Sequence, residues 1–107
     1  MDIQVNKDQL DRVIIKWLNN NYGDLKKEKY EFSINDNSYS YSKKNSKKIL
    51  MDYNTNNKVL HVEDVFLGSL IDLFKIDFPH LRRIIKKWVY ETYHIEAIVV
   101  NGANYNS

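Results

Sequence analysis

Two histidine–glutamate pairs are the first residues in this 107-residue sequence whose spacing could support chemistry. His61 and Glu63 are two positions apart, and so are His94 and Glu96. On a β-strand, residues i and i+2 share a face, so each pair could offer two metal ligands. A four-ligand site for a metal-dependent hydrolase would require the two strands to be neighbours. The plainer interpretation is that these residues lie at strand ends or on the surface.

Other catalytic patterns are missing or incomplete. The sequence has no cysteine, which excludes a thiolate nucleophile and a cysteine-based zinc site. The chain has only three glycines, too few for a glycine-rich phosphate-binding loop, and it lacks the Gly-x-Ser-x-Gly motif of acyl-transfer enzymes. The predicted order of elements resembles the core of PD-(D/E)xK nucleases, but Asp52-Tyr53-Asn54 lacks the required lysine and the predicted second strand has no acid. We therefore expect a non-enzymatic protein that uses no cofactor, no metal and no small-molecule substrate.

A basic helix face gives the most specific binding hypothesis. Arg82, Arg83, Lys86 and Lys87 lie on one side of a predicted helix, opposite its apolar residues. Such a face could contact phosphates, and with the preceding helix it could mimic a helix-turn-helix. The net charge of only +2 is low for a dedicated DNA reader. The competing interpretation is the solvated polar face of an ordinary amphipathic helix.

Aromatic residues favour a protein-interaction module instead. Eight Tyr, four Phe and two Trp are more than a core of this size would bury, so some are expected at the surface. Tyr39 and Tyr41 alternate with serines, and we predict that they are exposed interaction residues. The mechanism would be pairing of a strand edge, at 39–42 or 95–100, or packing of an open sheet face. A protein partner or a second copy of the chain is the leading expectation, and nucleic acid bound by the basic helix face is the alternative.

Hydrophobic periodicity predicts the elements that would position these residues. Leu10, Val13, Ile14, Trp17 and Leu18 form a helical stripe, and that helix should end near residues 20–22 with Gly23 after it. Asp77-Phe78-Pro79 should begin a new helix, because proline is tolerated in a first turn. The predicted strands are 30–34, 39–42, 49–53, 59–62 and 95–100, and the later helices are 65–75 and 79–93.

The element order α-β-β-β-β-α-α-β predicts an α+β fold in one small domain, residues 1–100, with a flexible C-terminal tail at 101–107. Short connections between the first four strands favour antiparallel pairing. We therefore expect an antiparallel sheet of four or five strands, packed on one face by amphipathic helices. A hydrophobic share of 43% agrees with such a core.

Residue usage gives a hint of origin. The sequence has 13 Lys, 13 Asn, 11 Ile and 8 Tyr, all residues with AT-rich codons. This predicts an AT-rich genome, that of a bacteriophage, a large DNA virus, a low-GC bacterium or an AT-rich eukaryote. The small size favours a viral, phage or mobile-element protein, either a virion or assembly component or a host-directed accessory factor. Residues 1–4 do not read as a basic-then-apolar leader, and the longest apolar run has four residues, 97–100. We expect no membrane association and a cytoplasmic location, which for a viral protein would be the host cytoplasm or the virion.

Overall fold

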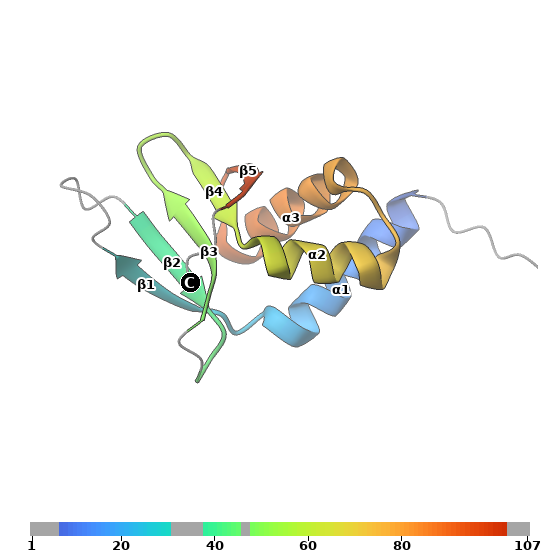
Figure 1. The fold of residues 1–107 in the computed structure, drawn as a ribbon, viewed down its shortest axis with the longest axis horizontal. Coiled ribbons are helices and arrows are strands. Elements are labelled where there is room, and N and C mark those ends of the chain that lie inside the picture. The colour runs from blue at the N-terminus through green and yellow to red at the C-terminus, as the bar shows by residue number, and fades with distance from the viewer. Residues whose placement is uncertain (1–6, 31–37, 46–47, 103–107) are drawn as a thin grey trace, which may run out of the picture.

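A computed structural model describes residues 7–30, 38–45 and 48–102. The elements follow the predicted order and form a small α+β domain, with the helices gathered on one side of the sheet (Figure 1). They are α1 (Lys7–Tyr22), β1 (Lys26–Tyr30), β2 (Ser38–Ser42), β3 (Ile49–Asn54), β4 (Val59–Val62), α2 (Asp64–Phe74), α3 (Phe78–Tyr93) and β5 (Ile98–Asn101).

The sheet is mixed, which corrects the prediction that it is antiparallel. Its strand order is β1-β2-β3-β4-β5, and the first four strands form an antiparallel meander. The last strand, β5, runs parallel to β4, and the Ile98 N–H donates to the Lys58 carbonyl at 2.8 Å. Two helices separate β4 from β5, and they carry the chain away from the sheet and back again. The returning strand therefore starts beside the beginning of β4, and two strands that start at the same end are parallel.

The ends of the sheet differ from the predicted boundaries in two places. β1 ends at Tyr30, which pairs with Ser38, whereas the alternation of residue types predicted a strand over 30–34. Most of that predicted strand and of the turn at 36–38 lies outside the described residues. At the other end, Asn101 belongs to β5 and the Gly102 N–H donates to the Val62 carbonyl at 2.7 Å. Residues 103–107 of the predicted tail also lie outside the described part.

The helix boundaries follow local chemistry. α1 ends at Tyr22, as predicted, and a side chain at Gly23 would collide with the Asn19 carbonyl oxygen. The Asp77 carboxylate caps α3 by accepting from the His80 backbone N–H at 2.9 Å, which satisfies one of the free donors of the first turn. Pro79 lies in that first turn, where its missing N–H costs nothing.

The core joins one face of the sheet to the three helices. α1 is rotated so that Ile15 is buried while Val13 is 56% exposed, and Val13 therefore leaves the predicted apolar stripe. Val65, the first residue of the predicted helix 65–75, is also exposed. The reason is that each helix is covered over only part of its circumference, and the stripe read from sequence is wider than that contact. The residues less than 2% exposed include Ile14, Leu18, Tyr41, Met51, Leu60, Val62, Leu70, Leu81, Ile84, Ile85 and Trp88.

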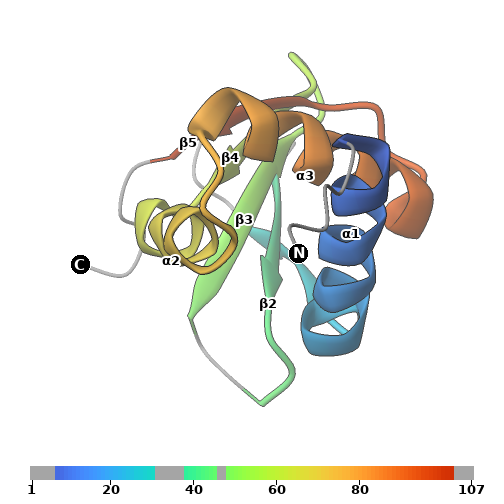
Figure 2. The same ribbon diagram turned by 90° about the vertical axis from the view of Figure 1, so that its right-hand side faces the viewer.

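A hydrogen bond fixes the packing of α3 on α1, which lie side by side in Figure 2. Trp88 is completely buried, and its indole N–H donates to the Asn19 side-chain oxygen at 2.9 Å. The Thr92 hydroxyl donates to the same oxygen at 3.4 Å. A buried indole needs a partner for its N–H, so Asn19 sets where the tryptophan can lie along α1.

We predict that Asn19→Ala lowers the free energy of unfolding by about 1 kcal/mol, because the Trp88 indole loses its acceptor. Asn20→Ala, one position along the exposed side of α1, is the matched control and should leave stability unchanged. Urea denaturation followed by tryptophan fluorescence measures both. Equal stabilities for the two variants would show that the hydrogen bond contributes nothing.

Candidate anion-binding surface

The structure corrects the prediction for Tyr41. This side chain is 0% exposed, and its ring lies 4.9 Å from that of Tyr93, centroid to centroid. Within the described residues, neither hydroxyl has a hydrogen-bond partner. Burial raises the pKa of each tyrosine to about 12, since the phenolate cannot be solvated there. Tyr41 is therefore a core residue and cannot present its ring to a partner.

Tyr39 and the two candidate strand edges also offer little to a partner. Tyr39 is half-buried against the core, and β2 is an interior strand flanked by β1 and β3. β5 is an edge strand, and alternate residues of a parallel strand bond to the neighbouring strand. Ile98 and Gly102 bond to β4, so the backbone groups of Val99 face the open edge, where an added strand would have to reach them. Val99 is only 2% exposed. The middle of that edge is thus closed to an added strand.

The two histidine–glutamate pairs do not converge. Among the described residues, no three His, Asp or Glu side chains are placed to hold a metal ion. Glu63 is buried, and its carboxylate lies 3.4 Å from the Lys48 ammonium. His94 follows the last residue of α3 in the left-handed conformation, and its backbone N–H donates to the Tyr90 carbonyl. The structure therefore removes the geometry that the metal-dependent hydrolase needed.

The basic residues of α3 lie where the sequence predicted. Arg82, Arg83, Lys86 and Lys87 are all exposed, on the side of the helix opposite its buried residues. The Arg82 guanidinium lies 5.9 Å from the centre of the Phe78 ring, within cation–π range. In the part of the chain that the structure describes, none of the four cations forms an ion pair.

Three of these cations line a groove of about 600 Å³, the α3–β5 groove. Lys58, from the turn between β3 and β4, adds a fourth cation from another element, and Glu96 is the one acid among the lining residues that the structure describes. Tyr90 and Ile98 lie in the same groove with 52% and 58% of their surfaces exposed. The full lining is Asn57, Lys58, Arg83, Lys86, Lys87, Tyr90, Glu96, Ala97 and Ile98.

The walls of this groove are held by short-range hydrogen bonds. The Asn54 side-chain oxygen accepts from the Asn56 N–H at 2.9 Å, and the Asn57 side-chain oxygen accepts from the Val59 N–H at 3.0 Å. These bonds shape the turn that carries Lys58, whose φ of 61° is left-handed. On the facing segment, the Tyr53 hydroxyl donates to the Glu96 carbonyl at 3.5 Å. The cations are therefore presented from fixed backbone positions.

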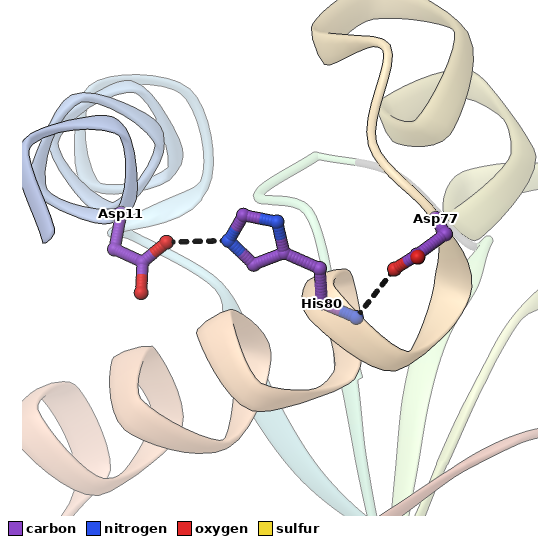
Figure 3. Close-up of polar contacts among 3 residues, drawn as sticks. All are labelled: Asp11, Asp77 and His80. Atoms are coloured by element: carbon purple, nitrogen blue, oxygen red, sulfur yellow. Dashed lines mark hydrogen bonds and ion pairs between the residues drawn. The ribbon is translucent and has the colours of Figure 1, made fainter. Parts of the chain in front are cut away.

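A second hollow, of about 620 Å³, lies at the N-terminal end of α3 and shares Arg83 with the groove. Lys75 and Arg82 add further cations there. His80 also lines it, and its Nε2 lies 2.6 Å from the Asp11 carboxylate of α1, with both side chains mostly buried (Figure 3). The basic face of α3 thus continues from the groove into this hollow.

The Asp11–His80 pair has the form of the orienting half of an acid–base dyad. Such dyads activate a hydroxyl or thiol, and the described lining of the second hollow contains neither: it consists of Leu10, Lys75, Ile76, Asp77, Pro79, His80, Arg82 and Arg83. The pair joins α1 to the first turn of α3, at the end opposite to the Asn19–Trp88 bond. Its observed geometry is that of a structural link between the two helices.

Sequence reasoning missed three residues of the groove. Lys58, Tyr90 and Ile98 come from a turn, a helix and a strand, and only the fold brings them beside the basic residues of α3. Tyr90 carried a usable signal, because it falls on the polar side of α3 together with Lys86 and Lys87. An aromatic ring on a cationic helix face is a feature that sequence can show.

Comparisons with known proteins give no relative. No family of proteins, no curated protein and no solved structure matches this chain. Over the described ranges, none of the helices is long and apolar enough to cross a membrane.

The buried tyrosines make a prediction about alkaline stability. The pKa of Tyr41 is near 10 in the unfolded chain and about 12 in the folded one, so the unfolded tyrosine ionises first. The free energy of unfolding is therefore unaffected below pH 10 and falls as the pH rises toward 12. Between these two pKa values, each such tyrosine lowers the free energy of unfolding by about 1.4 kcal/mol per pH unit. Tyr41→Phe should unfold with unchanged or slightly higher free energy at pH 7 and show a shallower decline above pH 10.

Urea titrations at pH 7 to 11 test this, with Tyr53→Phe as a control, because that hydroxyl has an acceptor. A loss of several kcal/mol for Tyr41→Phe at pH 7 would mean that its hydroxyl is bonded in solution.

Proposed function

We propose that this chain is a nucleic-acid-binding domain whose contact surface is the basic face of α3 together with Lys58. The observation that carries the proposal is the α3–β5 groove, in which, over the residues that the structure describes, four cations without ion pairs meet one acid. Like charges held in one groove repel each other, and a polyanion would turn that repulsion into attraction. Phosphates bound there would also release their counterions, which is the main driving force of such binding.

The arrangement suits a polymer better than a single small anion. Arg83 and Lys87 are one helical turn apart, about 6 Å along the axis, so their charges repeat along the groove. Arg83 also lines the second hollow, where Arg82 and Lys75 continue the row. A chain with one charge per repeating unit could contact several of these cations at once.

A protein-interaction module is the second candidate, now at a different place from the buried Tyr41. Exposed Tyr90 and Ile98 line the groove together with Ala97, and these apolar residues favour a partner segment that carries both acidic and apolar side chains. The two candidates share a surface and differ in ligand, so one set of variants tests both.

Binding of a fluorescent 20-nucleotide DNA should weaken steeply with salt. Four neutralised phosphates on a single strand give a slope of about −3 for log K against log salt. Arg83→Glu with Lys87→Glu should abolish binding, because the groove then carries three acids against two cations. Anisotropy titrations at 50 to 200 mM salt measure the affinity and the slope.

The matched control is Lys16→Glu, a charge reversal on the exposed side of α1 outside both hollows. It should bind as the unmodified protein does, and all variants should keep the same thermal midpoint within a few degrees. Affinity that ignores salt, or that falls equally in the Lys16 control, would refute the proposal.

The acid in the groove gives an independent prediction. Glu96→Gln removes the one negative charge among the described lining residues and should tighten binding at 50 mM salt by severalfold, since the side chain is exposed and partly screened. The gain should shrink at 200 mM salt. Weaker binding by Glu96→Gln would place the carboxylate in a favourable contact with the ligand instead.

A further inference from the structure

We infer that the nucleic acid bound in the α3–β5 groove is single-stranded, with one base stacked on the ring of Tyr90. This inference rests on the proposed function and adds the class of ligand to it. Proteins that bind single strands combine cations that follow the backbone with aromatic rings that receive bases. The groove has both kinds of group within a single concave surface.

Tyr90 is placed to offer its ring. It is 52% exposed, whereas its neighbours Trp88 and Val89 are fully buried. Among the described aromatic residues, none stacks on it. Burial of half of an aromatic ring by a base would remove apolar surface from water, which is the source of the stacking energy.

The cations that line the groove with this ring come from two elements. Lys86 and Lys87 precede Tyr90 by four and three residues, so they lie on the same part of the helix surface. Lys58 lines the same groove from another element, the turn between β3 and β4. A base on Tyr90 would therefore have cations of two elements available for its neighbouring phosphates.

Stacking on Tyr90 disfavours a duplex. The ring can receive the face of a base only if that base is unstacked from its neighbours, and bases in a duplex are stacked on each other. The groove of about 600 Å³ is lined by residues of α3, of the turn between β3 and β4 and of the segment that begins β5. Ile98, 58% exposed, forms an apolar side of the same concavity.

The test compares Tyr90→Ala and Tyr90→Phe with the unmodified protein, using a 20-nucleotide single-stranded DNA and the matching duplex. We expect tighter binding of the single strand. Tyr90→Ala should lose about tenfold in affinity for it, the worth of one stacked base. Tyr90→Phe should restore most of this loss. The salt slope should be the same in all three proteins, because the ring carries no charge.

Leu73→Ala is the control, since Leu73 is 55% exposed on α2 and lies outside the groove. Equal affinity of Tyr90→Ala and the unmodified protein, or tighter binding of the duplex, would overturn this inference. If that binding still fell with salt and vanished in the Arg83 and Lys87 double variant, the proposed function would stand. No binding of either DNA, or equal binding of a polyglutamate peptide, would overturn both.

Discussion

The amphipathic packing of α3 is the constraint on which the rest of the structure depends. One side of this helix is buried against α1, α2 and β5, with Trp88 and Ile85 fully enclosed. Each such side chain contributes about 1.5–3 kcal/mol on burial, whereas an exposed ion pair contributes about 1 kcal/mol or less. The hydrophobic side therefore sets the rotation of the helix, and the rotation fixes where Arg83, Lys86 and Lys87 point.

The low net charge of the chain is a poor guide to this surface, because several of the acids are engaged elsewhere in the fold. Asp77 caps α3, Asp11 binds His80, and Glu63 is buried beside Lys48. Asp52 is also buried and accepts from Ser40, and burial raises its pKa. In the described part of the chain, none of these four carboxylates forms an ion pair with a cation of α3. A sum of charges over the chain thus describes the partner surface poorly.

The sequence predicted those parts of the fold that depend on local periodicity. α3 shows a strong period of 3.6 residues, so its buried side and its exposed cations were predictable, and the segment Asp77-Phe78-Pro79 indicated where it starts. The alternation in β2 shows that Tyr39 and Tyr41 share a face, but a period of two does not say which face is buried. The parallel pairing of β5 and the meeting of Lys58 with Tyr90 depend on how distant elements return to each other. Local sequence patterns do not predict such contacts between distant segments.

Two of the cations occupy backbone positions that usually favour glycine. Lys58 in the turn and Lys75 after α2 have φ values of 61° and 55°, and no described glycine has a positive φ. At such a position glycine is less strained than a residue with a Cβ by about 1 kcal/mol. A directed-evolution experiment that selects only for heat resistance should therefore enrich glycine at both positions. The resulting proteins would unfold at a higher temperature and would lack one positive charge in each of the two hollows.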